Sequence, residues 1–248
     1  MTVTDRVAIV TGSGQGIGAG IAETLARAGA NVVVNDIFGD KATATAEAIA
    51  NAGGKAVAVV ADVADEAEVT SLVDHTLAEF GRVDILVNNV GIARDAWLAK
   101  MSLENWEMVL RVNLTSQFLT TRAVVPHMIE QKSGRIINIS SRAWLGGPGQ
   151  SNYAASKGAV VSLTRTLALE LAKFDITANA IAPALIDTPL FRSLAEDVQE
   201  RLLKTIPAGR LGSTEDIGNA VLFFAADESS YVTGQLLYIC GGRSLGAG

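Results

Sequence analysis

Short apolar runs typical of strands alternate with helical patterns along almost the whole chain. The expected strands cover 7–11, 31–36, 56–61, 85–88, 135–139, 177–181 and 235–239, and the expected helices cover 17–28, 41–52, 66–80, 102–131, 153–174 and 214–226. Strands that alternate with helices are joined by right-handed crossovers, which make neighbouring strands parallel. The pattern therefore predicts a doubly wound α/β fold with a parallel sheet of about seven strands and helices on both faces.

The composition indicates where the apolar residues go. The 248-residue chain is 49% hydrophobic, with a mean hydropathy of +0.30, yet no run approaches the roughly 18 apolar residues that a membrane-spanning helix needs. Blocks such as VAIV and AVAVV are typical of strands covered on both faces. No linker rich in Pro, Ser or charge interrupts the series, so we expect a single domain over 1–248 with a substrate lid over about 184–210.

Net charge and cysteine content indicate which classes of partner and which cellular compartment to expect. The formal charge of −6, with 26 acidic residues against 20 basic ones, argues against nucleic acid or an anionic membrane as a partner. Cys240 is the single cysteine, which indicates a reducing compartment. The first apolar run is too short for a signal peptide and ends in a glycine-rich turn. We therefore expect a cytoplasmic protein.

That glycine-rich turn joins the first expected strand to the first expected helix. It is TGSGQGIG over residues 11–18, a T-G-x-x-x-G-x-G spacing. Glycines permit a tight turn and close approach of a ligand, while the N-terminus of the helix offers free N–H groups to a phosphate. Ile17 occupies the last Gly position of the G-x-G-x-x-G fingerprint of a Rossmann-type fold, so the turn alone is weak evidence for a dinucleotide site.

An acidic residue at the end of the second expected strand indicates which dinucleotide would bind. Asp36 lies 18 residues beyond Gly18, where a carboxylate can accept hydrogen bonds from a ribose 2′-OH and would repel a 2′-phosphate. Gln15 is not the Arg or Lys that would neutralise that phosphate. Both residues favour NAD over NADP, the alternative being that Asp36 merely ends a strand. Asp62, at the end of the third strand, contacts the adenine amino group or caps a helix.

A tyrosine and a lysine four residues apart open a later helix. Tyr153 and Lys157, in NYAASKG, lie on one face of that helix. A phenol with a pKa of about 10 is a poor acid–base group at neutral pH, and a neighbouring ammonium favours its phenolate. The pair predicts an activated tyrosine, with its pKa lowered by roughly three pH units, although such a pair on its own is more often a surface feature.

Taken together, these motifs resemble one family. TGSGQGIG, Asp36, the NNVG of 88–91, Asn113, the ISS that ends at Ser141 and the YAASK of 153–157 are similar to the short-chain dehydrogenase/reductase family, in its branch of NAD-dependent alcohol dehydrogenases and 3-oxoacyl-carrier-protein reductases. The resemblance runs from residue 7 to residue 242. It implies an oxidoreductase that interconverts a secondary alcohol and its ketone.

The resemblance also implies a role for each matching residue. Tyr153 would exchange a proton with the substrate oxygen, Lys157 would lower its pKa and bind the nicotinamide ribose, and Ser141 would hydrogen-bond the substrate. Asn113 would hold a water that links Lys157 to solvent. The NAD-binding residues would be Gly12, Gln15, Gly16, Ile17, Gly18, Asp36, Asp62, Val63, Asn89, Gly91, Tyr153, Lys157, Pro183, Ile186 and Thr188.

Three positions depart from the family's pattern. Val90 stands where the family usually has Ala, and Ala184 where it often has Gly. Ser141 precedes Tyr153 by 12 residues rather than the usual 13, and Ser140 would restore that spacing. The alternation of residues 137–139 matches the motif to Ser141, so we expect Ser141 to contact the substrate, with Ser140 as the alternative.

The resemblance places large apolar side chains on the substrate side of Tyr153, which predicts an apolar, possibly cyclic or aryl, substrate. The expected pocket residues are Trp97, Trp144, Leu145, Phe191 and Leu194, with core or interface packing as the alternative. His75 and His127 have no neighbours at metal-ligand spacing, so we expect no metal.

Two other functions compete with an NAD-dependent alcohol dehydrogenase. A 3-oxoacyl-[acyl-carrier-protein] reductase would usually use NADPH and need a basic patch for its carrier, which Asp36, Gln15 and the acidic charge disfavour. An inactive dinucleotide-binding scaffold would not need all four catalytic residue types. The resemblance further implies a homotetramer, with the helices over 101–131 and 153–174 at one interface and the C-terminal strand and tail at another.

Overall fold

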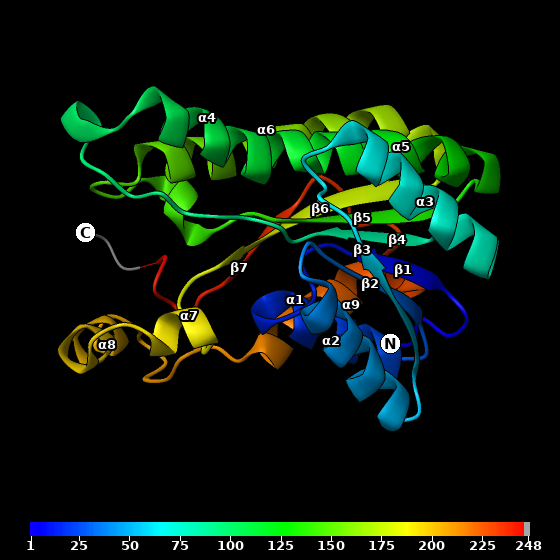
Figure 1. The fold of residues 1–248 in the computed structure, drawn as a ribbon, viewed down its shortest axis with the longest axis horizontal. Helices are drawn as coiled ribbons and strands as arrows, with labels where there is room; N and C mark the ends of the chain where they lie inside the picture. The colour runs from blue at the N-terminus through cyan, green and yellow to red at the C-terminus, as the bar shows by residue number, and fades with distance from the viewer. Residues whose placement is uncertain (246–248) are drawn as a thin grey trace.

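One parallel sheet of seven strands lies at the centre of the computed structural model, which describes residues 1–245 (Figure 1). The strands are β1 (Val7–Val10), β2 (Asn31–Asp36), β3 (Lys55–Val60), β4 (Ile85–Asn88), β5 (Gly134–Ile139), β6 (Ile176–Pro183) and β7 (Leu236–Ile239). Their order, β3-β2-β1-β4-β5-β6-β7, confirms the predicted doubly wound α/β fold. The order reverses between β1 and β4, where parallel sheets of this kind form a ligand crevice at the carboxyl ends of their strands.

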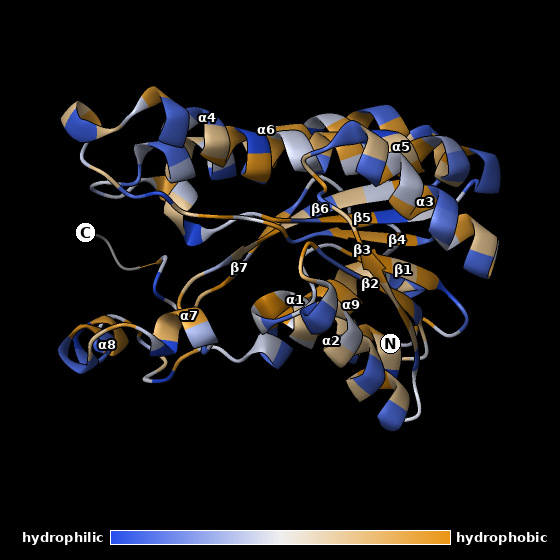
Figure 2. Ribbon diagram, viewed as in Figure 1, coloured by the Kyte–Doolittle hydropathy of each residue, from blue (hydrophilic) through white to orange (hydrophobic). Residues whose placement is uncertain are grey.

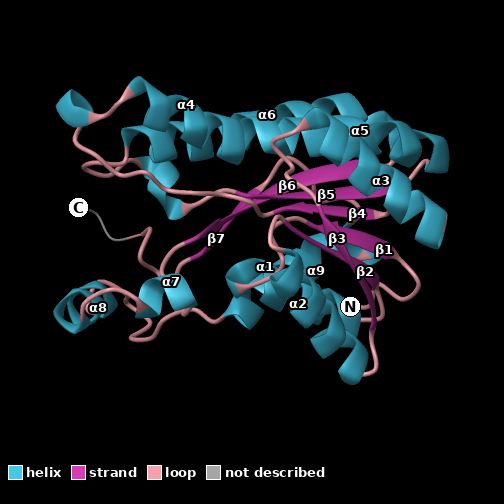
Figure 3. Cartoon of the chain, in the orientation of Figure 1, coloured by secondary structure: helices cyan, strands magenta, loops and turns pink. Residues whose placement is uncertain are grey.

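Helices cover both faces of the sheet (Figures 1 and 3). On one face lie α1 (Gly16–Arg27), α2 (Gly39–Asn51) and α9 (Thr214–Ala225), and on the other lie α3 (Glu66–Phe80), α4 (Leu103–Leu110), α5 (Ser116–Gln131) and α6 (Ser151–Leu171). Two hydrophobic clusters, one on each face, bury the side chains of the central strands. Figure 2 shows these strands as the apolar centre, with hydrophilic residues on the outer helix surfaces.

The two edge strands differ from the prediction that all strands are covered on both faces. The central strands β1, β4, β5 and β6 are buried throughout, whereas β3 and β7 are partly exposed along their length. An edge strand pairs on one side only, so β-branched runs such as those of β3 do not by themselves distinguish an edge from the centre.

The long helix expected over 102–131 is interrupted. A π-helical turn at Arg111–Thr115 separates α4 from α5, and the Ser116 N–H donates to the Arg111 carbonyl across the widened turn. The Ser116 hydroxyl donates to the Val112 carbonyl at 2.6 Å, so a side chain partly replaces the regular helical bond there. Such turns often occur at functional sites, and this one contains Asn113.

The segment predicted as a substrate lid holds two short helices, α7 (Pro189–Arg192) and α8 (Glu196–Leu203). Its ends are joined, because Ile186 pairs with Gly212 in a parallel bridge and the Asp187 N–H donates to the Gly212 carbonyl at 2.8 Å. In Figure 1 α7 and α8 lie beyond the carboxyl ends of the strands, away from the helices that cover the sheet. The loop is thus fixed at its base while its helices project outward.

Two structural features, membrane-spanning helices and clusters of metal-ligating side chains, would indicate a membrane or a metal as a partner. Within residues 1–245, no helix is both long enough and apolar enough to cross a membrane. The same residues contain no group of three or more His, Cys, Asp or Glu side chains arranged to hold a metal. Residues 246–248, the end of the tail predicted to lie at a subunit interface, are outside the described range.

Candidate active site

Hydrogen bonds from Asn89, directly after β4, hold the glycine-rich turn between β1 and α1 in place. The Asn89 amide donates to the Thr11 and Gly12 carbonyls, both at 3.0 Å, and the Thr11 hydroxyl accepts from the Asn89 N–H at 3.0 Å. A Cβ on Gly18 would lie 2.2 Å from the Gly12 carbonyl oxygen, so no larger residue fits there without a backbone shift. Asn89 therefore shapes the turn rather than reaching out to a ligand with its amide.

The start of α1 suits a pyrophosphate. Its N-cap residue, Gln15, makes no side-chain hydrogen bond to the first turn, so the free N–H groups of that turn have no side-chain cap. A Cβ on Gly16 would meet only the Thr188 side chain, at 3.9 Å, which leaves open space in front of those groups. Free N–H groups at a helix N-terminus bind phosphate oxygens, and the residues present thus fit a dinucleotide.

Asp36 is fixed at the end of β2 by two backbone groups. Its carboxylate accepts hydrogen bonds from the Gly14 N–H at 3.0 Å and the Phe38 N–H at 3.1 Å, one at each oxygen, and its residue is 9% exposed. Each carboxylate oxygen can accept a second bond. The carboxylate is therefore held beside the glycine-rich turn with capacity left for ribose hydroxyls.

Asp62 and Val63 follow β3. The Asp62 carboxylate accepts from the Ala64 N–H at 2.9 Å, and Val63 is buried. The N-cap of α3 is Asp65, whose side chain accepts from the N–H groups of residues 67 and 68. The alternative that Asp62 caps this helix is therefore wrong.

Tyr153 and Lys157 lie together on the first turns of α6. The Lys157 ammonium donates to the Ile139 carbonyl at 2.9 Å and lies 5.8 Å from the centre of the Tyr153 ring. A Cβ on Gly91 would lie 3.1 Å from Lys157 Nζ, so the glycine of NNVG leaves room for the buried ammonium. The ends of two strands, β4 and β5, thus meet α6 at this lysine.

The structure separates the two candidate serines. Ser140 is buried, and its hydroxyl donates to the Lys157 carbonyl at 2.8 Å, inside the protein. Ser141 is half-buried, starts the short helical turn Arg142–Leu145, and interacts with the Tyr153 side chain. Ser141 is therefore the serine that lies beside the tyrosine, and Ser140 supports the helix that carries Lys157.

The side-chain amide of Asn113 is hydrogen-bonded to other residues of the protein. Its amide nitrogen donates to the Ile92 carbonyl at 2.9 Å and the Ser156 hydroxyl at 3.1 Å, and its oxygen accepts from the Ile92 N–H at 2.7 Å. These bonds tie the π-helical turn to α6 and to the segment after β4. A water of the predicted relay would have to bond to the Asn113 backbone carbonyl or to a spare lone pair of its Oδ1.

Burial dominates the electrostatics of the pair. It raises the pKa of the Tyr153 phenol; the Ser141 interaction works in the lowering direction and the Asp95 charge adds to the increase. Burial also lowers the pKa of Lys157 from 10.5 to about 8. The expected lowering of the tyrosine pKa by Lys157 is therefore wrong for the chain by itself, because burial opposes the phenolate. A further positive charge at this site would favour it.

The buried ammonium makes the free energy of unfolding depend on pH. Between pH 8 and 10.5 the unfolded chain keeps a proton on Lys157 that the folded chain has lost, so stability rises with pH through this window. We expect Lys157→Met to gain most stability relative to wild type below pH 8, and this advantage to shrink by roughly 3 kcal/mol by pH 10.5. Urea unfolding of both proteins across that range measures it. An advantage that does not change with pH would contradict the buried charge.

Comparisons with known proteins show which family the chain belongs to. A family model described as enoyl-(acyl carrier protein) reductase matches residues 12–244. Over 248 residues, 100% of both chains, the protein is 48% identical to the (2S)-[(R)-hydroxy(phenyl)methyl]succinyl-CoA dehydrogenase subunit BbsD of Thauera aromatica. The chain belongs to the short-chain dehydrogenase/reductase family.

Other members of the short-chain dehydrogenase/reductase family are also similar over almost their whole length. The 3-oxoacyl-[acyl-carrier-protein] reductase of Synechocystis sp. is 46% identical over 246 residues, 97% of each chain. The crystal structure of a gluconate 5-dehydrogenase from Burkholderia cenocepacia in complex with NADP and tartrate has a TM-score of 0.94 and 39% identity, and the match covers 99% of this chain and 98% of that one. This chain is an oxidoreductase of the same family.

The predicted pocket residues of this short-chain dehydrogenase/reductase differ in environment. Trp97 is 68% exposed, Leu145 and Leu194 are also exposed, Trp144 is half-buried, and Phe191 is only 8% exposed. The Phe191 N–H donates to the Thr188 hydroxyl at 3.3 Å. Trp144 lies three residues after Ser141, in the helical turn Arg142–Leu145 that packs against α6.

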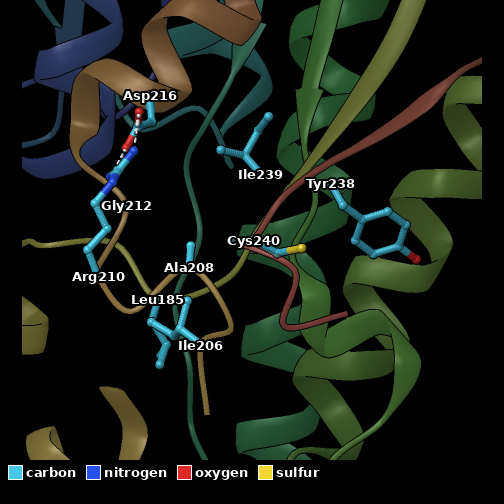
Figure 4. A pocket seen from close by; sticks show the side chains of 10 residues that line it. Leu185, Ile206, Ala208, Arg210, Gly212, Asp216, Tyr238, Ile239 and Cys240 are labelled. Atoms are coloured by element: carbon cyan, nitrogen blue, oxygen red, sulfur yellow. Dashed lines mark hydrogen bonds and ion pairs between the residues drawn. The ribbon is translucent and has the colours of Figure 1, made fainter. Parts of the chain in front are cut away.

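The structure instead has a cavity that sequence reasoning missed (Figure 4). It has a volume of about 320 Å³ and lies between the end of β7, the segment after β6 and the segment after α8. Its lining residues are Leu185, Ile206, Ala208, Arg210, Gly212, Asp216, Tyr238, Ile239, Cys240 and Gly241. Arg210 and Asp216 form an ion pair at its wall, with an N–O distance of 2.7 Å. Its residues come from three distant segments, and no local motif joins them.

Proposed function

We propose that the chain is an NAD(H)-dependent dehydrogenase that interconverts an apolar, cyclic or aryl secondary alcohol and its ketone. The observation that carries this proposal is the buried Lys157 ammonium beside the Tyr153 ring, with Ser141 next to the phenol. Proton transfer to or from the substrate oxygen requires the tyrosine, the lysine and the serine to lie close together.

Each residue has a distinct part in this reaction. The glycine-rich turn, Asp36 and Thr188 would hold the cofactor, which would accept the hydride as NAD⁺ in oxidation and supply it as NADH in reduction. Tyr153 takes the proton of the substrate hydroxyl in oxidation and returns it to the carbonyl oxygen in reduction. Ser141 orients that oxygen, and the Lys157 charge stabilises the phenolate.

The cofactor preference follows from Asp36. Its carboxylate, held by the Gly14 and Phe38 N–H groups, would accept bonds from a ribose 2′-OH and repel a 2′-phosphate. We expect kcat/KM with NAD to exceed that with NADP by at least about 100-fold. Asp36→Ala should remove most of that preference, with Asp40→Ala as a control on the exposed start of α2. A wild-type preference for NADP would overturn the cofactor assignment.

A screen with NAD identifies the alcohol. The named substrate of the Thauera aromatica relative contains a hydroxy(phenyl)methyl group, which is a secondary aryl alcohol. We therefore expect 1-phenylethanol to be oxidised faster than cyclohexanol, and both faster than 2-octanol, as NADH absorbance will show. Oxidation of primary alcohols alone would contradict the proposal.

A 3-oxoacyl-[acyl-carrier-protein] reductase remains the second candidate because relatives of 42% and 46% identity carry that name. Its use of NADPH and of a carrier protein distinguishes this candidate from the NAD-dependent alcohol dehydrogenase. If NADPH-dependent reduction of a 3-oxoacyl carrier protein exceeds every alcohol oxidation with NAD, this candidate replaces the first.

We also propose the homotetramer. Apolar side chains on α4, α5 and α6 are exposed in the single chain, including Leu103, Phe118 and Leu169, the last at 84%. Apolar helix faces of this kind are commonly buried between subunits. Light scattering should give four times the chain mass of 25.8 kDa, and a monomer would refute the assignment.

A further inference from the structure

Two arginines, one of them next to the catalytic serine, follow the ends of β5 and β7, the two strands that flank β6. Arg142 follows Ser141 directly and begins the helical turn Arg142–Leu145, which packs against α6. Arg243 lies in the tail after β7, and the charges of the two guanidinium groups act on one another. Among the ion pairs of residues 1–245, none includes either arginine.

Polar atoms around this pair are left without partners. Arg142 Nε and Trp144 Nε1 are both buried and make no hydrogen bond within the described chain. Buried donors without partners cost free energy, and so do two like charges in a partly buried site. Burial and the Arg142 charge together lower the pKa of Arg243. All of these costs would be relieved by one group that accepts hydrogen bonds and carries negative charge.

The position of Arg243 connects this site to the lid. Its Nε donates to the Thr205 hydroxyl at 2.7 Å, and the Ala208 N–H donates to the Gly241 carbonyl at 3.0 Å. The tail therefore packs against the segment that ends the lid, beside the cavity drawn in Figure 4. An anion between Arg142 and Arg243 would contact the helical turn Arg142–Leu145 and the tail after β7, and it would lie near the end of the predicted lid.

We propose that Arg142 and Arg243 bind an anionic group of the substrate, the oxygens of a carboxylate or of a phosphate, while its secondary alcohol lies at Ser141 and Tyr153. This inference rests on the proposed function and adds the substrate's charge to it. Because Arg142 follows Ser141 in the chain, one substrate molecule could contact both residues, with its anionic group at Arg142 and its alcohol at Ser141. Asp95, which also acts on Tyr153, accepts a hydrogen bond from Gln150 at 3.0 Å, so its charge is partly engaged elsewhere.

Three alcohols with NAD test the proposal and identify the source of the charge. These are 1-phenylethanol, which is neutral, 3-hydroxy-3-phenylpropanoate, which has a carboxylate, and 3-hydroxy-3-phenylpropanoyl-CoA, which has phosphates but no free carboxylate. Since a charge-assisted hydrogen bond contributes about 10- to 100-fold in binding, we expect at least about a tenfold higher kcat/KM for one of the two anions over the neutral alcohol. A preference for the free acid assigns a carboxylate, and a preference confined to the thioester assigns phosphate.

Charge-removing variants locate the site. Arg142→Gln and Arg243→Gln should each remove most of that preference and leave 1-phenylethanol oxidation within about twofold. Arg27→Gln, at an exposed arginine on α1 that pairs with Glu215, is the matched control and should change neither. Equal losses on all three alcohols, or a preference that survives in both variants, would overturn the proposal. If the variants do not fold, the wild-type preference decides, and its absence also overturns it.

A binding experiment separates failure of this inference from failure of the proposed function. With NADH bound, 3-phenylpropanoate should bind at least about tenfold more tightly than 3-phenylpropanamide, as titration of NADH fluorescence will show. This result needs no turnover. Oxidation of 1-phenylethanol without any preference for the acid over the amide leaves the proposed function standing and removes the anion site. Tighter binding of the acid than of the amide, without oxidation of 1-phenylethanol, keeps the anion site and rejects the alcohol reaction.

Discussion

Tyr153→Phe is expected to lower kcat by about 1,000-fold or more while NADH binds within about twofold of wild type. The phenylalanine keeps the ring that lies 5.8 Å from Lys157 Nζ, so the packing of the half-buried site is retained. Only the hydroxyl that exchanges a proton with the substrate is lost. Steady-state alcohol oxidation gives kcat, and fluorescence titration gives the NADH affinity.

A matched tyrosine provides the control for this variant. Tyr231 is fully exposed after the short turn Asp227–Ser229, and Tyr231→Phe should leave both kcat and NADH affinity unchanged. If Tyr153→Phe retains more than about one tenth of the wild-type kcat, another group transfers the proton and the assignment of Tyr153 is wrong.

Gly18→Ala is expected to have the second largest effect, on the fold of the dinucleotide site. The new Cβ would lie 2.2 Å from the Gly12 carbonyl oxygen and 2.8 Å from Ser13 Cα, and neither backbone atom can move freely. The Asn89 amide, which holds the turn, would be 2.7 Å away. We expect the free energy of unfolding to fall by roughly 3 kcal/mol, and the Kd of NADH to rise at least about tenfold because the turn must open.

Another glycine separates this local effect from a general cost of alanine. A Cβ on Gly158, within α6, would have no described atom within 4 Å apart from its chain neighbours and the backbone of its own helix. Gly158→Ala should therefore raise the free energy of unfolding by up to about 1 kcal/mol, since alanine favours a helix. Thermal unfolding and NADH titration compare the two variants. Wild-type NADH affinity in Gly18→Ala would contradict the close packing of the turn.

The sequence predicted the elements of the fold because their patterns are local. Short β-branched runs between glycines identified each strand to within a few residues, and strict alternation required the parallel sheet. The π-helical turn at Arg111–Thr115 was missed, since no Pro or Gly marks it and the Ser116 hydroxyl bond that accompanies it has no sequence signature. The exposure of β3 was missed because strand order is a property of the whole sheet.

The candidate site was predictable where one motif supplies it and not where several segments meet. The Tyr153–Lys157 pair follows from helical spacing, but the lysine pocket needs Gly91 and the Ile139 carbonyl from two other strand ends. The direction of the tyrosine pKa was wrong because burial cannot be measured from spacing. The cavity by β7 joins residues up to 56 positions apart in the sequence, and Arg142 and Arg243, whose charges act on one another, are 101 positions apart.

Transfer of a labelled hydride tests the central claim most directly. When 1-phenylethanol deuterated at its carbinol carbon is incubated with the protein and NAD, mass spectrometry should find the deuterium in NADH and acetophenone as the other product. The Tyr153→Phe protein should form neither above background. Failure to form labelled NADH from this or any other secondary alcohol in the screen, with a folded protein that binds NADH, would contradict the account.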